Sequence, residues 1–185
     1  MKKAWLYISL LLPAISLSIF STSALYRRHA EQETSVISRL VYFPKDALKT
    51  ASLEFPGLLS DYLMLKTMTY MGEKIEKKKN LTKSEWQMVH QTLLQITSLD
   101  PRFWDPYLVA EVSLPWDAGM VDEANQMLLQ AADVRKDDYR PNFFLWFNHY
   151  YFLKDPKTAA PYLEKAARIP GAPYYYKTLA ARMSL

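Results

Sequence analysis

The sequence predicts an all-α protein: a short right-handed solenoid of helical hairpins, with about three repeats and a capping helix, preceded by an N-terminal membrane helix. Apolar residues recur at helical spacing along most of the chain, whereas alternating strand-like runs are scarce. Only 4 of the 185 residues are Gly, which disfavours a β-rich fold with many tight turns. The third observation is an internal repeat with a period of 35 residues.

The repeat is a small–large–small pattern at offsets of 0, 4 and 7 residues, which lie on one face of a helix. Alanine at both ends of the pattern lets a neighbouring helix approach closely. An aromatic or apolar segment precedes each copy, so each period holds two helices, as in helical solenoids. The two copies are Ala124, Leu128 and Ala131, then Ala159, Leu163 and Ala166.

The net charge of +4 comes from the N-terminal segment. Four of the 23 Lys and Arg residues lie at or before Arg28, and no acidic residue precedes Glu31, so 19 basic residues face 19 acidic residues in the remainder. A neutral remainder gives no electrostatic support for nucleic-acid binding. The chain has no Cys, which excludes disulfides, thiolate metal sites and a Cys nucleophile.

Residues 4–26 form an uncharged run of 23 residues, which is long enough to cross a hydrocarbon core of roughly 30 Å. Basic residues flank the run on both sides. Two interpretations stay open, an uncleaved signal anchor or a secretory signal peptide cut after Ala24. The length of the run and the basic residues after it favour the anchor, whereas the serines in its second half favour cleavage.

The rest of the chain is expected to fold as one helical domain. The expected parts are an anchor in residues 1–28, a stalk and lead-in in residues 29–55, and a helical domain in residues 56–185. Pro56 suits the first turn of a helix, and apolar residues then keep helical spacing as far as Gly72. We interpret the charged run from Glu73 to Lys83 as a solvated loop rather than a patch that binds phosphate or lipid.

Several capping patterns predict helix boundaries in this domain. Thr82 and Glu85 have the spacing of a capping box, and the Leu-Asp-Pro sequence at residues 99–101 ends that helix. Asp155-Pro156 is a cap followed by Pro at the first helical position. We expect a last helix over residues 174–183.

The segment over residues 143–152 is the most aromatic part of the chain, and its rings cover more than one face of a helix. We expect Phe143, Phe147 and Tyr150 to enter the core. The acidic pair Asp137-Asp138 is expected on the surface.

These units resemble the tetratricopeptide repeat family, in which a large residue in the first helix precedes an alanine in the second helix by about 16 residues. In that family a large residue and a second alanine follow, and a proline closes the unit. One unit matches at Phe143, Ala159, Leu163, Ala166 and Pro170, and an earlier one at Tyr107, Ala124, Leu128 and Ala131 with a one-residue change in length.

The resemblance extends to a more degenerate first unit that ends at residues 99–101, so it covers residues 56–170, with residues 173–183 as a capping helix. The layout as a whole is similar to that of small bacterial membrane-anchored proteins that carry a short tetratricopeptide array. The resemblance implies a protein-binding role rather than a chemical one.

In such solenoids the first helices of the repeats line a concave groove that binds peptides, and Met and aromatic linings suit apolar recognition. The alternative is that this stripe is buried against the chain's own stalk or capping helix. The expected groove residues are Met64, Met68, Asp105, Leu108, Val112, Phe144, Asn148 and Tyr151.

The sequence offers little for catalysis. His29, His90 and His149 lie far apart, and none has a second His or carboxylate at metal-ligand spacing. We expect His149 to be a packed residue or a groove residue rather than a ligand. The chain contains no nucleophile-elbow, Walker or dinucleotide-binding glycine motif. We therefore expect no enzyme activity, no metal or cofactor, no small-molecule substrate and no nucleic-acid partner.

The expected function is a membrane-tethered protein–protein interaction module, a scaffold or assembly factor for an envelope complex, which binds a protein or peptide partner. The alternative is a constitutive structural subunit of a larger membrane complex. Its isolated soluble part, residues 34–185, would then aggregate or be unstable. The flanking charges are nearly balanced, so topology follows the habit of N-terminal anchors to keep the short end inside. We expect a single-pass protein of the bacterial inner membrane with its C-terminal domain extracytoplasmic.

Overall fold

The computed structural model describes residues 22–23, 48, 52 and 54–183. The chain divides into two units, Met1–Arg39 and Leu40–Leu185, and nearly all described residues belong to the second. Every regular element among the described residues is helical, which confirms the all-α fold. The expected membrane helix over residues 4–26 lies outside the described residues apart from Thr22 and Ser23. Among the helices that are described, none is long and apolar enough to cross a membrane.

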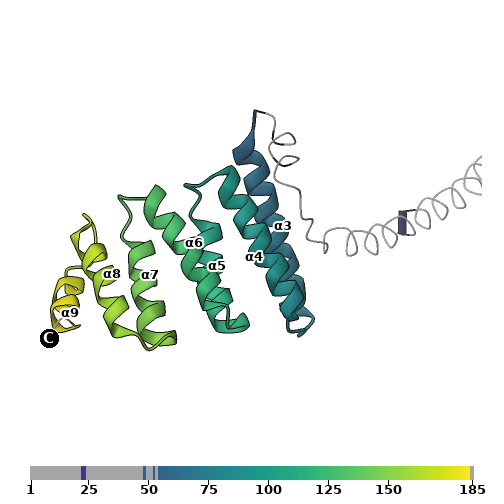
Figure 1. Ribbon diagram of the computed structural model, residues 1–185. Helices are drawn as coiled ribbons and strands as arrows, with labels where there is room; N and C mark the ends of the chain where they lie inside the picture. Colours follow the sequence, from purple (N-terminus) through teal and green to yellow (C-terminus); the bar gives the residue numbers. More distant parts are fainter. Residues whose placement is uncertain (1–21, 24–47, 49–51, 53, 184–185) are drawn as a thin grey trace, which may run out of the picture. The chain divides into compact units, whose positions relative to one another are not determined.

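The second unit is a row of helices that stand side by side in chain order, with successive helices running in opposite directions (Figure 1). They form the hairpins α3–α4, α5–α6 and α7–α8, and α9 follows. A π-helical turn ends the first helix of the second and third hairpins. The elements are α3 (Pro56–Glu76), α4 (Lys83–Leu99), α5 (Asp105–Ser113), η1 (Leu114–Ala118), α6 (Val121–Val134), α7 (Arg140–Phe147), η2 (Asn148–Phe152), α8 (Pro156–Arg168) and α9 (Tyr175–Met183).

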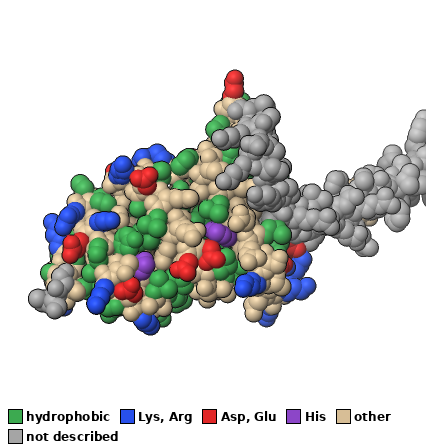
Figure 2. Space-filling view, viewed as in Figure 1, with side chains coloured by type: hydrophobic (Ala, Val, Ile, Leu, Met, Phe, Trp, Pro, Cys, Tyr) green, Lys and Arg blue, Asp and Glu red, His purple; other side chains and the backbone are tan. Residues whose placement is uncertain are grey.

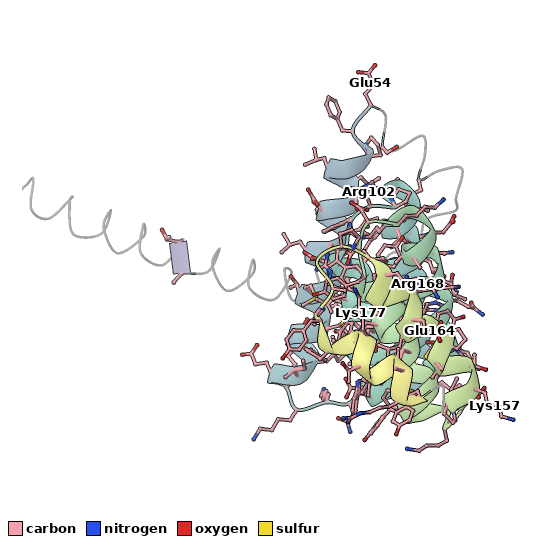
Figure 3. All side chains as sticks on the ribbon, turned by 90° about the vertical axis from the view of Figure 1, so that its left-hand side faces the viewer. Glu54, Arg102, Lys157, Glu164, Arg168 and Lys177 are labelled. Carbon is pink, nitrogen blue, oxygen red and sulfur yellow. The ribbon has the colours of Figure 1, made fainter. Side chains whose placement is uncertain are left out.

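The ends of the helices form two opposite edges of this unit. Glu54 and Arg102 lie at one edge, where α3 and α5 begin, and Lys157 lies at the other, where α8 begins (Figure 3). The turns within the hairpins therefore share the edge marked by Lys157.

The two small–large–small patterns form the seams between helices. Ala124 and Ala131 on α6, and Ala159 and Ala166 on α8, are all fully buried, as are the leucines between them. This confirms that the repeated face is a packing face. Because a methyl group is all that projects at the alanines, the helix axes can approach closely there.

The predicted caps are confirmed. The Thr82 hydroxyl accepts a hydrogen bond from the Glu85 backbone N–H at 3.3 Å, and the Glu85 carboxylate accepts one from the Thr82 N–H at 2.7 Å. The Asp155 carboxylate accepts from the Thr158 N–H at 3.1 Å, and Pro156 is the first residue of α8. α4 ends at Leu99 as expected.

The end predicted for the first helix at Gly72 is wrong, because α3 continues to Glu76. A glycine inside a helix costs only about 1 kcal/mol. A contact with α4 holds the extra turn: Lys74 forms an ion pair with the Glu85 carboxylate, which also accepts a hydrogen bond from the Tyr70 hydroxyl at 2.8 Å.

The aromatic segment packs differently from the prediction. Leu145 is the fully buried residue of α7, whereas Phe143 and Phe147 are half-buried and Tyr150 is exposed. The prediction for Tyr150 is wrong because the buried face of this segment runs through Pro141, Leu145 and Asn148, and Tyr150 lies well away from that face.

Asp138 is half-buried rather than exposed, contrary to expectation, whereas Asp137 is exposed as expected. The Asp138 carboxylate accepts hydrogen bonds from Arg135 at 2.9 Å and from Arg140 at 2.7 Å. Burial acts to raise the pKa of Asp138, but the hydrogen bonds from the two arginines outweigh it and lower the pKa to about 2. The Arg140 guanidinium also lies 4.4 Å from the centre of the Trp104 ring, so this cluster joins α5 to the turn before α7.

Neighbouring leucines on α6 test the buried seam. Leu128 is 0% exposed and Leu129 is 47% exposed. Leu128→Ala removes buried methyl groups and leaves a cavity, so we expect a loss of about 2–5 kcal/mol in the free energy of unfolding. Leu129→Ala is the matched control and should change it by about 0.5 kcal/mol or less. Urea unfolding of the full chain in detergent, followed by circular dichroism, measures both; equal effects would mean that the Leu128 face is not buried.

Candidate partner-binding surface

The eight predicted groove residues do not form one continuous surface. Met68, Asp105, Val112 and Tyr151 are exposed, whereas Leu108 and Phe144 are half-buried and pack against the core. Met64 and Asn148 are buried.

Asn148 must be removed from the candidate surface. It is 0% exposed, and its side-chain amide donates hydrogen bonds to the Glu111 carboxylate at 2.7 Å and to the Asn125 carbonyl at 3.0 Å. The prediction failed because it put Phe143 and Phe147 on the core face, whereas Leu145 is the fully buried residue and Asn148, three residues later, lies on the same face.

Phe144 is likewise part of the packing rather than of a free groove. Its ring stacks on Trp104 at a centroid distance of 6.3 Å, and Trp104 is itself 9% exposed. Met64 lies on the face of α3 that packs into the core. The concave stripe expected from the sequence is therefore interrupted on two of its three helices.

A different cluster of aromatic rings reaches the surface at the edge where the hairpins turn. We call Trp116, Phe147, Tyr151 and Phe152 the aromatic surface. The Trp116 ring lies 4.9 Å from Phe152, 5.5 Å from Tyr151 and 6.2 Å from Phe147, measured between ring centres. Trp116 is 54% exposed and Tyr151 is 45% exposed, so both present ring area to solvent.

The backbone explains why rings from two hairpins meet here. Trp116 lies in η1 and Tyr151 in η2, and the two residues are 35 positions apart, which is the period of the alanine pattern. Pro115 lacks an N–H and opens the helical hydrogen-bond ladder in the first turn. After each turn one residue is left-handed, Gly119 at φ +67° and Lys154 at φ +54°, again 35 positions apart.

Lys154 adds a positive charge beside the aromatic surface. Its ammonium lies 4.8 Å from the centre of the Tyr151 ring, within the range of a cation–π interaction. Lys154 has a positive φ of +54°, which is uncommon for a residue other than glycine. The neighbouring Asp155 carboxylate accepts hydrogen bonds from Thr158, and none of the ion pairs of the described residues joins it to Lys154.

Glu111 is a buried acid behind this surface. It lies on α5, is 2% exposed, and receives its hydrogen bond from Asn148. Burial raises the pKa of Glu111 to about 7, and the hydrogen bond from Asn148 only partly offsets that effect. The cluster of Glu111, Asn125 and Asn148 ties α5, α6 and η2 together, so it fixes the two hairpins that carry the aromatic rings.

The sequence contained signals for both features that the prediction missed. Glu111 follows Tyr107 by four residues and precedes Leu114 by three, so it lies on the same helix face as two core residues. Trp116 stands 35 residues before Tyr151 and could have been aligned with it.

The described surface also has shallow hollows. One of about 410 Å³ lies between α4 and α6, and one of about 290 Å³ between α8 and α9, where Glu164, Arg168 and Lys177 are seen in Figure 3. None of the eight predicted groove residues lines either of these two hollows. On the face shown in Figure 2, acidic and basic side chains are interspersed with apolar ones.

Metal-ligating side chains do not gather in the part of the chain that the structure describes, where no group of three His, Asp or Glu could hold an ion. The His149 ring stacks on Tyr162 at 5.4 Å, as a packed residue does. No protein-family model matches the chain, and comparison with curated proteins and with solved structures found no match.

The titration of Glu111 gives a pH-dependent prediction. Because its pKa rises from 4.5 to about 7 on folding, the folded chain keeps a proton that the unfolded chain releases between these values, and stability falls as pH rises through this range. Glu111→Gln keeps an acceptor oxygen for Asn148 and removes the titration. The variant should match the wild type near pH 4.5 and be more stable by roughly 3 kcal/mol above pH 7.

Urea unfolding of both proteins at several pH values measures this difference. Glu76→Gln, at an exposed position on α3, is the matched control and should follow the wild type throughout. A Glu111→Gln variant whose advantage does not grow with pH would show that Glu111 is not a buried acid.

Proposed function

We propose that this protein is a membrane-tethered interaction module that holds a partner polypeptide on the aromatic surface of a short tetratricopeptide-like solenoid. The proposed architecture is supported by three consecutive hairpins, by alanine seams 35 residues apart that are fully buried, and by a terminal helix that covers α8. Stacked hairpins with a regular spacing present equivalent positions along one edge, which suits a scaffold for protein binding.

The single observation that carries the proposal is the exposed ring area of Trp116 and Tyr151 at equivalent positions of two hairpins. Aromatic residues are enriched at protein interfaces and at energetic hot spots, where large, rigid side chains bury much area at small entropic cost. The rings of Trp116 and Tyr151 already pack edge-on against Phe152, so their side chains lose little conformational freedom when a partner binds.

The proposed occupant is a polypeptide segment that places apolar side chains over the rings and an acidic residue near Lys154. The ammonium of Lys154 stands beside the surface, and Lys157 is exposed at the same edge. Complementary charge at the rim of an interface favours correct encounter more than it adds affinity.

The tether is proposed from residues 4–26, whose uncharged run and basic flanks suit a single membrane-spanning helix. In this proposal the helical domain is extracytoplasmic in a bacterial inner membrane and acts in the assembly of an envelope complex. A module held at the bilayer meets membrane partners at a raised effective concentration.

Substitution of both exposed rings tests the proposed function. The full chain, tagged and purified from its own membranes after cross-linking, should recover a defined partner. Trp116→Ala with Tyr151→Ala should lower that recovery by about tenfold or more, because hot-spot side chains contribute at least about 2 kcal/mol each. Recovery is measured by quantitative mass spectrometry, with circular dichroism to verify the fold.

Tyr174→Ala with Tyr175→Ala is the matched control, since both rings are exposed but lie before and in α9 rather than at the hairpin turns. It should retain the partner. If the aromatic-surface variant and the control recover the same amount of partner, the aromatic surface is not the binding site.

A further inference from the structure

α3, the first helix of the row, carries apolar side chains on two opposite faces. One face, with Leu63, Met64 and Tyr70, is buried against α4 and the core. The other is open among the described residues: Leu58 is 70% exposed, Leu65 67% and Ile75 73%. Tyr62 and Met68 are also exposed on that side. A contiguous stripe of large, exposed apolar side chains on a helix marks a surface that contacts a partner or a membrane.

The open stripe has the spacing of a helix–helix seam. Leu58, Leu65 and Gly72 are seven residues apart, and Asp61, Met68 and Ile75 follow each of them by three, which is the a and d pattern of a heptad. A methyl group built on Gly72 would meet no atom of the described residues within 4 Å, apart from the backbone of its own helix. Among those residues the stripe is therefore open at Gly72, with room for the side chain of a neighbouring helix.

The charges along α3 are unequal at its two ends. The N-terminal end carries Glu54 and Asp61, whereas Lys77, Lys78 and Lys79 follow its C-terminal end. Lys77 forms an ion pair with Glu73 of the same helix, which leaves the lysine end positive overall. Two copies of α3 side by side in the same direction would bring lysines against lysines, whereas opposite directions bring them against acidic residues.

We propose that the open stripe of α3 binds the same stripe of a second copy of this chain, with the two helices antiparallel. In one register Leu58 meets Ile75 of the second copy, Leu65 meets Met68, and Asp61 meets the space left by Gly72. The same register places Glu54 opposite Lys79. A two-fold contact of this kind is self-complementary, because each apolar residue of the stripe meets another and each charged end meets its opposite.

We favour a second copy over an unrelated partner because the stripe is complementary to itself. When two copies lie antiparallel, apolar residues face apolar residues and the acidic end of one α3 faces the lysine end of the other. The stripe lies on α3, whereas the aromatic surface lies on η1, α7 and η2, so the two proposals stand or fall separately. A bilayer could also cover an apolar helix face, and the experiment below distinguishes that case.

Cysteine cross-linking tests the proposal cleanly, because the chain has no Cys of its own. Full-length Leu58→Cys and Ile75→Cys chains are mixed in detergent and oxidised with copper phenanthroline. The antiparallel pair predicts a disulfide-linked dimer in the mixture and little in Leu58→Cys alone, because its two cysteines would lie about 17 helical residues, or roughly 25 Å, apart. Met88→Cys, exposed on α4, is the matched control and should not cross-link with either chain.

A charge in the stripe provides the second measurement. Leu65→Glu should weaken self-association of the full chain in detergent by about tenfold or more, because a carboxylate would be buried against Met68 of the second copy. Leu129→Glu, at an exposed position on α6 outside the stripe, should leave self-association unchanged. Sedimentation velocity measures both variants, and circular dichroism shows that they are folded.

Three results would overturn the proposal. A dimer of Leu58→Cys alone would mean a parallel pair, and a monomer with no cross-link in any mixture would mean that no second copy binds. A wild-type chain that is monomeric in detergent, and whose residue 65 becomes protected only in lipid vesicles, would mean that the bilayer covers the stripe.

Discussion

The close approach of neighbouring helices at four alanines is the constraint on which the rest of this structure depends. Ala124, Ala131, Ala159 and Ala166 are fully buried, so α6 and α8 can each contact helices on either side without a gap. A larger side chain at any of them would force the hairpins apart or out of register. The 35-residue period of these seams then places the turns of successive hairpins beside each other.

The candidate surface follows from that register. Two π-helical turns, each followed by a left-handed residue, bring Trp116 and Tyr151 to the same edge of the row. Behind them the buried Glu111, hydrogen-bonded to Asn148, joins the second hairpin to the third. Packing, hydrogen bonding and surface chemistry therefore all depend on the same spacing, and a shift of one hairpin would disrupt each of them.

The sequence predicted the helices, their caps and the buried seams because each depends on a local pattern with a strong physical cause. The capping box at Thr82 and the buried Leu163 are examples. It failed where a helix is aromatic on more than one face: Phe143 and Phe147 were assigned to the core in place of Leu145, which put the buried Asn148 on the surface and Tyr150 in the core. The extension of α3 past Gly72 was missed because Lys74 reaches across to α4, a contact that no local pattern contains.

The central claim is that the hairpins stack in a register that brings the two turns together. Nuclear Overhauser effects between the Trp116 indole and the Phe152 ring, recorded on the full chain with labelled aromatic residues in detergent micelles, measure this directly. The account predicts a clear cross-peak, because the two ring centres lie 4.9 Å apart and the rings meet edge to face. A folded, helical protein without that cross-peak would contradict the account.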